Sequence, residues 1–113
     1  MRSEIKTWLF DILQSIEEID GYFTYKPKRF EDYLSDTKTQ RAVERNLEII
    51  GEAVNRIIKV DPEFQIENAK KIIGVRNRII HGYNSISHEL IWSIVINHLP
   101  NLYREISNLI DNR

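Results

Sequence analysis

The stretch RAVERNLEIIGEAVNRI, residues 41–57, decides the fold class of this 113-residue chain. Its apolar residues are spaced four, three, four and three positions apart: Val43, Leu47, Ile50, Val54 and Ile57. Because an α-helix turns once in ~3.6 residues, this spacing places them all on one side of a helix. The stretch therefore predicts a long amphipathic helix, which begins near the capping residues Ser35 or Asp36 and ends at Asp61-Pro62.

Gly51 lies in the middle of this predicted helix. A glycine there costs about 1 kcal/mol relative to alanine, so its presence needs a compensating reason. The usual reason is the close approach of a neighbouring helix. The sequence thus predicts tight helix packing at Gly51.

The N-terminal part of the chain also has helical periodicity. Apolar residues from Ile5 to Phe23 form one stripe, with Ser3 as the expected N-cap and Gly21 where the pattern ends. Residues 28–34 have room for a helical turn or two. We expect the side chains of this short segment to point inward at Phe30, Tyr33 and Leu34.

The C-terminal part completes the bundle. Residues 66–81 predict a shorter helix that Gly82 terminates, and a last helix starts at Ser87 and continues to Leu109. Pro100 should kink or split that last helix, because proline cannot donate a backbone hydrogen bond. No alternating strand pattern competes. We expect an all-α, antiparallel bundle of four or five helices, in one domain spanning residues 1–113.

Composition restricts the class of protein. The chain has no cysteine, which excludes disulfides and thiolate metal sites. It has no apolar signal core at its start and no run near the ~20 apolar residues that span a bilayer. These features favour a cytoplasmic protein with no membrane segment. The formal net charge of −1 argues against a general binder of polyanions.

One basic cluster departs from that average charge. Residues 69–83 contain four cationic residues and no acidic one: Lys70, Lys71, Arg76 and Arg78. A solvated helix face is the ordinary explanation of such a cluster. The same stretch, however, also contains Asn77 and His81, which suit chemistry at a phosphate.

These side chains suit the transesterification of RNA. RNA carries its own nucleophile, the 2′-hydroxyl, so a base, an acid and a cation suffice without a metal. Histidine can act as base or acid near neutral pH, and arginine can hold a phosphate through two hydrogen bonds. The residue types alone leave a simpler alternative open, in which Arg76 is a salt-bridge donor and His81 a helix cap. His88 and His98 have no ligand-spaced partners, and we interpret both as structural or surface residues.

Helix geometry adds a constraint on this candidate site. Asn77 and His81 are four residues apart and share a helix face, whereas Arg76 and His81 are about 140° apart around an ideal helix. Arg76 and His81 would therefore not converge within one regular helix. Either the helix loosens at Gly82, or two copies of the chain meet across a two-fold axis. Aromatic residues on the helix stripes (Trp8, Tyr22, Trp92 and Tyr103) fit either a dimer interface or the core of one chain.

The pattern Arg-Asn-x-x-x-His-x-Tyr, formed by Arg76, Asn77, His81 and Tyr83, resembles the signature of HEPN-domain proteins of the HepT type. Residues 41–53, with their Ile-Gly-Glu-Ala sequence, resemble the second helix of that family. Trp92 and Leu99-Pro100, which follow the motif, also resemble the residues that the family often has there. The family often has a tryptophan shortly before the motif, where this chain reads Ile66-Glu67-Asn68-Ala69. This departure concerns packing.

The resemblance implies a HEPN-like homodimer with the arginine and histidine of both subunits at a common cleft. It further implies an endoribonuclease toxin in which Arg76 and His81 are catalytic and Asn77 supports them. Its implied partner is an MntA-like nucleotidyltransferase antitoxin that uses ATP to transfer AMP to Tyr83. The chain itself would need no cofactor and no metal. We add Lys70, Lys71 and Arg78 as expected contacts to the RNA backbone.

Two other functions remain open on the sequence. The bundle could be a non-catalytic subunit that binds the substrate of a nucleotidyltransferase, or a structural dimer in which the motif caps a helix. The full Arg-Asn-His-Tyr set favours the toxin, since a binding subunit needs no titrating histidine beside an arginine. The carboxylates of Glu44, Glu48 and Glu52 are spaced four apart, and we expect a solvated acidic stripe, although Glu52 could pair with a motif arginine.

Overall fold

The computed structural model describes residues 1–82 and 86–111, and its regular elements within these ranges are all helical. In chain order they are α1 (Ser3–Gly21), α2 (Phe30–Leu34), α3 (Thr37–Val60), α4 (Ala69–His81), α5 (His88–Ser93), the π-helical turn η1 (Ile94–His98) and α6 (Leu99–Asp111). Since α5, η1 and α6 follow one another without a break, the described chain forms four long helical segments and the short α2. The all-α prediction is confirmed.

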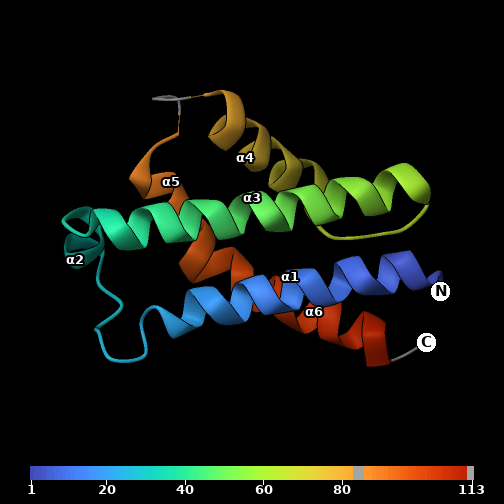
Figure 1. Cartoon of the computed structure of the whole chain (residues 1–113), viewed down its shortest axis with the longest axis horizontal. Helices are drawn as coiled ribbons and strands as arrows, with labels where there is room; N and C mark the ends of the chain where they lie inside the picture. The colour runs from blue at the N-terminus through green and yellow to red at the C-terminus, as the bar shows by residue number, and fades with distance from the viewer. Residues whose placement is uncertain (83–85, 112–113) are drawn as a thin grey trace.

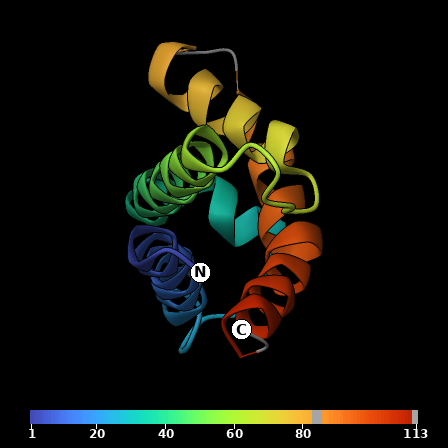
Figure 2. The ribbon, with the colours of Figure 1, turned by 90° about the vertical axis from the view of Figure 1, so that its right-hand side faces the viewer.

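The long helix α3 lies between its neighbours α1 and α4 (Figure 1). Both neighbours run antiparallel to α3, and α6 packs on α1. Viewed along the long axis, α4 lies on the outside of the bundle, above α3 and the start of the last helical segment (Figure 2). This arrangement gives α3 two covered sides and leaves α4 with one. No described helix is long and apolar enough to cross a membrane.

The predicted apolar stripes form the core. The stripe of α3 (Val43, Leu47, Ile50, Val54 and Ile57) is buried, as is that of α1 (Ile5, Leu9, Ile12, Ile16 and Ile19). Asp36 caps α3 by accepting a hydrogen bond from the backbone N–H of Thr39. Hydrogen bonds from Thr39 and Lys26 hold the pKa of the Asp36 carboxyl well below its usual range. The predicted cap at Ser87 is also present.

Several predicted boundaries were wrong by a residue or a turn. Ser3 does not cap α1: the N-cap is Arg2, whose side chain makes no capping hydrogen bond, and Ser3 is the first helical residue. The helix that carries the motif begins at Ala69, a turn later than Ile66. Leu34 does not point inward, since it is 48% exposed at the end of α2, whereas Tyr33 is buried.

Pro100 changes the geometry of the last helical segment without breaking it. The five residues Ile94–His98, just before this proline, form a π-helical turn, and the α-helix resumes at Leu99. A proline removes one backbone donor and its ring displaces the preceding turn, which accounts for the wider turn at this place. The expected disturbance therefore takes the form of a π turn.

The aromatic residues whose role was open make contacts within the chain. Trp92 packs against Phe23, Phe30 and Tyr33, with ring centroids 5.1–6.1 Å apart. Tyr22 donates a hydrogen bond to Asn46 (2.5 Å), and Tyr103 donates one to Glu17 (2.6 Å). Burial of the Tyr33 ring raises the pKa of its phenol. These contacts support the interpretation of the aromatics as part of one chain's packing.

Candidate active site on α4

The candidate site residues lie on α4, a regular helix from Ala69 to His81 that ends at Gly82. At about 100° per residue, Lys70, Asn77 and His81 fall on one outer face of this helix. Asn77 and His81 are exposed there. Arg76 lies about 100° away from Asn77, toward α3, and it is half-buried. The helix does not loosen before Gly82. Arg76 and His81 of one chain are therefore not brought together by an irregular turn within α4.

Arg76 occupies a gap that Gly51 leaves on α3. A Cβ atom added to Gly51 would lie 2.3 Å from Cβ of Arg76 and 3.2 Å from the backbone oxygen of Ile72. No real side chain fits at such a distance. The predicted close approach at Gly51 is therefore confirmed, and its neighbour is Arg76 itself.

The Arg76 guanidinium is fixed by two polar partners. Its Nη2 donates to Oε2 of Glu52 in a short charge-assisted contact, and its Nη1 donates to Oδ1 of Asn77 at 2.9 Å. The Nε atom of Arg76 is buried without a partner in the described structure. Glu52 also accepts from Nε of Arg56 at 3.0 Å. A chain of polar contacts thus runs from Arg56 through Glu52 to Arg76 and Asn77.

The expected solvated acidic stripe was wrong for two of its three members. Glu52 pairs with Arg76 and Arg56, and Glu44 pairs with Arg41 at 3.1 Å. Glu48 is the exposed member. The position of Glu52 directly after Gly51 was the feature of the sequence that indicated its ion pair. A residue beside a helix-packing glycine lies at the rim of the helix–helix contact, within reach of the neighbouring helix.

The exposed part of the Arg76 side chain lines a shallow pocket between α1 and α3. Its lining includes Trp8 and Ile49, three carboxylates (Asp11, Glu48, Glu52) and two arginines (Arg56, Arg76). Counting these formal charges gives two positive and three negative, a net charge of −1. The surroundings of Arg76 in one chain therefore do not attract a phosphate by themselves.

The other predicted residues are distributed over two sides of α4. Lys70 shares the outer face of Asn77 and His81, whereas Lys71 and Arg78 lie about 60–120° around the helix from these residues, on the side of Val75. His81 makes no hydrogen bond with Arg76 in the part of the chain described. Tyr83 lies outside the described residues. Among residues 1–82 and 86–111, no three His, Asp or Glu side chains are grouped to hold a metal ion.

The family model of Ribonuclease HepT-like proteins matches residues 12–109, which include α3, α4 and the whole candidate site. The chain belongs to this HepT-like family. The match agrees with the resemblance that residues 41–53 and 76–83 carry.

Relatives of this HepT-like chain match it over most of its length. A Methanocaldococcus jannaschii protein, provisionally named an RNase, is 37% identical over 114 residues, covering 96% of this chain and 89% of its own. A Thermococcus cleftensis protein, provisionally named ribonuclease HepT, is 34% identical over 113 residues, covering 96% and 98%. A Caldanaerobacter subterraneus protein, also provisionally named an RNase, is 34% identical over 85 residues, covering 72% and 73%. No solved structure gives a significant match.

Proposed function

We propose that this chain is the toxin of a two-gene toxin–antitoxin system, a metal-independent endoribonuclease with a composite site of Arg76 and His81. Membership of the HepT-like ribonuclease family supports the reaction class. The observation that carries the proposed site is the fixed position of Arg76, held by Glu52 and Asn77 at the crossing of α3 and α4. An arginine held in this way needs no reorganisation when a phosphorane forms beside it.

The geometry of α4 supports a homodimeric site. His81 is about 140° around the helix from its own Arg76, so one chain does not direct both at one phosphate. The net negative charge around Arg76 also supports a homodimeric site. Binding of an RNA phosphate there needs further positive charge, which one chain does not supply at this pocket. A second copy that presents its outer face of α4, with Lys70 and His81, would supply it.

In this proposal the chemistry is an internal transesterification of RNA. A histidine removes the proton of the 2′-hydroxyl, whose oxygen attacks the adjacent phosphorus. Arg76 stabilises the added negative charge, with Asn77 orienting the guanidinium. The P–O5′ bond breaks, and the 5′-oxygen takes a proton from the acid. The products are a 2′,3′-cyclic phosphate and a 5′-hydroxyl end. Lys70, Lys71 and Arg78 stay predicted contacts to the RNA backbone.

The proposed regulation is AMP transfer to Tyr83 by an MntA-like nucleotidyltransferase antitoxin. The phenolic oxygen of Tyr83 attacks the α-phosphorus of ATP, a phosphodiester bond forms, and pyrophosphate leaves. Each AMP adds bulk and negative charge close to His81 in the sequence, where RNA would bind. The motif resemblance supports this proposal, and ATP is a substrate of the partner, so the chain itself holds no cofactor.

The ribonuclease proposal is tested with purified protein and a defined RNA in the presence of a chelator. We expect product ends that carry a 2′,3′-cyclic phosphate. Arg76→Ala and His81→Ala should each reduce cleavage by about 100-fold or more, the usual contribution of such groups. Arg41→Ala is the matched control, because Arg41 is an exposed, ion-paired arginine near the start of α3, ten residues before Gly51. Full activity in both site variants would refute the site, and binding of RNA without cleavage by the parent would favour the subunit function.

The composite nature of the site has a separate test. When Arg76→Ala and His81→Ala chains are mixed and allowed to exchange subunits, a mixed dimer contains one intact Arg76 and one intact His81 in different copies. Cleavage should then return in part. If exchange is shown by mass spectrometry and cleavage stays absent, the site does not combine residues of two copies.

The AMP-transfer proposal is tested by mass spectrometry after incubation with the neighbouring nucleotidyltransferase and ATP. An AMP adduct should map to Tyr83 and be absent in Tyr83→Phe. Tyr25, which is 98% exposed, is the natural control acceptor, so an adduct on Tyr25 would move the modification site.

A further inference from the structure

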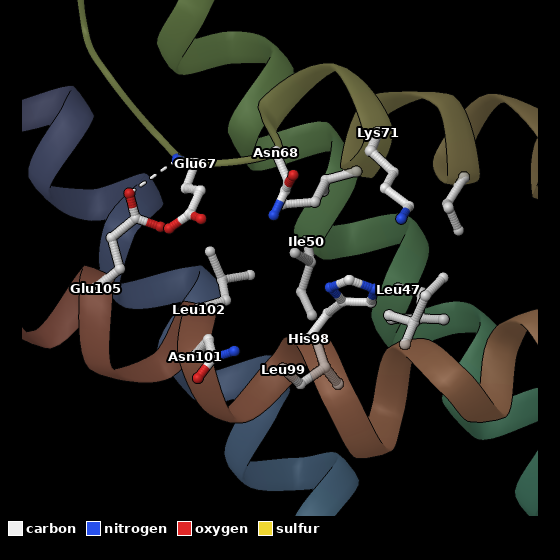
Figure 3. Close-up of a pocket in the computed structure, with 13 residues that line it drawn as sticks. Leu47, Ile50, Glu67, Asn68, Lys71, His98, Leu99, Asn101, Leu102 and Glu105 are labelled. Carbon is white, nitrogen blue, oxygen red and sulfur yellow. Dashed lines mark hydrogen bonds between the residues drawn. The ribbon is translucent and has the colours of Figure 1, made fainter.

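Figure 3 shows a second pocket. Its α4 residues (Lys71, Ile72 and Val75) lie on a different side of that helix from Asn77 and His81. α3, α4, η1 and the start of α6 surround the pocket. Its floor is aliphatic, and its residues come from three of these helices: Leu47, Ile50, Ile72, Val75, Leu99 and Leu102. A concave apolar floor with a few convergent polar groups is the usual form of a small-molecule site. Apart from Lys71, which is also a predicted contact to the RNA backbone, the residues of this pocket have no part in the proposed ribonuclease mechanism.

Three polar side chains converge on the pocket and have no partner within the described chain. Asn68 and Lys71 point into it from the wall formed by α4, and His98 points toward them from the opposite wall (Figure 3). Asn68 is the N-cap residue of α4, yet its side chain makes no capping hydrogen bond. Polar groups that converge without bonding one another are available to a ligand.

Local departures from regular backbone place two of these groups. Asn68 has a left-handed backbone conformation, with φ 62° and ψ 24°, which asparagine tolerates better than most residues. His98 is the last residue of the π turn that Pro100 causes. These two departures lie on opposite walls of the same pocket. Such departures are frequent at functional sites.

The charges of the pocket are separated between its two ends. At one end, the carboxylate of Glu105 accepts a hydrogen bond from the backbone N–H of Glu67 at 2.8 Å, and both glutamates lie there (Figure 3). This bond ties the segment before α4 to α6 and closes that end. At the other end, Lys71 supplies a positive charge beside His98.

The lining of this pocket carries one lysine and two glutamates, a net formal charge of −1. Arg76 is paired directly with Glu52, whereas Lys71 makes no ion pair within the described residues and the two glutamates lie at the far end of the pocket. A ligand with one anionic group would therefore place that group at Lys71.

We propose that this pocket binds a small amphipathic anion, with its apolar body on the aliphatic floor and a carboxylate or phosphate head at Lys71. Asn68 and His98 donate hydrogen bonds to the head group. The chemistry of the pocket does not depend on ribonuclease activity, so the two proposals stand or fall separately.

The binding test uses the fluorescent probe 8-anilinonaphthalene-1-sulfonate, which has an apolar body and one anionic group, and eight-carbon competitors. We expect saturable binding at one site per chain. Octanoate and octyl phosphate should displace the probe at lower concentrations than octanol, and octylamine should be the weakest. The order of the two anions identifies the preferred head group. Absence of saturable binding, or octanol competing as well as octanoate, would overturn the proposal.

Variants on α4 test the place of the head group. Lys71→Gln should raise the dissociation constant of octanoate about tenfold, the size of one charge-assisted hydrogen bond, and leave that of octanol unchanged. Lys70→Gln is the matched control, because Lys70 is the neighbouring exposed lysine and does not line the pocket. Equal affinities in the two variants would contradict the proposal.

A measurement on the unmodified protein keeps the test independent of folding in the variants. In a sample with labelled isoleucine methyl groups, octanoate should shift the NMR signals of Ile50 and Ile72, which line the pocket. The signals of Ile5 and Ile16, buried in α1, should not move. Shifts confined to α1 would place the ligand elsewhere and refute the assignment.

Discussion

The neighbouring helices α3 and α4 differ in how much of themselves they bury. Ten of the 24 residues of α3 are buried, whereas Val75 is the one buried residue among the 13 of α4. The reason is position, since α3 has α1 on one side and α4 on the other (Figure 1). The difference shows how a small bundle can fix site residues and still expose them: α3 provides the anchor, and α4 presents Asn77 and His81.

The central glycines of these two helices differ in the same way. A Cβ atom at Gly51 of α3 would collide with Arg76, whereas a Cβ at Gly74 of α4 would meet nothing within 4 Å. Both glycines cost helix stability. The packing of α4 on α3 explains Gly51, and nothing inside the described chain explains Gly74.

The largest expected effect comes from closing the gap at Gly51. In Gly51→Ala the new methyl group must displace Arg76 Cβ, which moves with the backbone of α4. We expect the free energy of unfolding to fall by about 1–3 kcal/mol, the usual cost of overpacking. Cleavage of RNA should fall as well, because Arg76 leaves its position beside Glu52. Urea unfolding followed by circular dichroism measures the first effect.

The control for this substitution is Ala53→Gly, which removes a methyl group two residues further along α3. It lowers helix propensity without adding an atom near Arg76 and should leave RNA cleavage by the folded protein nearly unchanged. If Gly51→Ala is as stable and as active as the parent, the contact between Gly51 and Arg76 does not position α4.

Much of α3 could be predicted from the sequence, because its burial follows from a periodic stripe of apolar residues and its start from Asp36. The position of Gly51 even predicted a close neighbour. The boundaries were harder. Ser3 and Arg2 are adjacent candidates for the N-cap position of α1. Leu34 is the last residue of α2, a helix of five residues, where a one-residue shift moves a side chain from the core to the surface.

The site on α4 was less predictable than the fold. Spacing alone correctly separated Arg76 from His81 on the helix surface. The role of Glu52 depends on a contact between residues 24 positions apart, and its place directly after Gly51 is the one local feature that distinguishes it from Glu48. The pocket around His98 depends on a π turn and on the convergence of three helices, which periodicity does not show.

A smaller effect is expected from the pair that joins the two helices. Glu52→Gln keeps an acceptor for one arginine and removes the charge that holds Arg76. We expect kcat for RNA cleavage to fall about tenfold, the size of one charge-assisted hydrogen bond. KM should not rise, because a carboxylate near the phosphate has been removed. The measurement is steady-state cleavage of a defined RNA.

Glu48→Gln is the matched control, since Glu48 lies one turn earlier on the same side of α3 and makes no ion pair within the described residues. It removes the same charge from the same pocket and should leave kcat unchanged. Equal losses in the two variants would mean that general electrostatics, and not the position of Arg76, sets the rate.

The smallest expected effect is at Gly74. Gly74→Ala should raise the free energy of unfolding by up to about 1 kcal/mol, because alanine favours the helix and the added methyl group meets open space. In the proposed homodimer, however, the outer face of α4 approaches a second copy, and the methyl group would obstruct it. We therefore expect weaker dimerisation in sedimentation velocity, although each chain becomes more stable. Asn108→Ala, at an exposed position of α6, should raise stability without changing the assembly. If Gly74→Ala dimerises as tightly as the parent, the close contact between copies lies elsewhere, and the proposed site must draw its second set of charges from another surface.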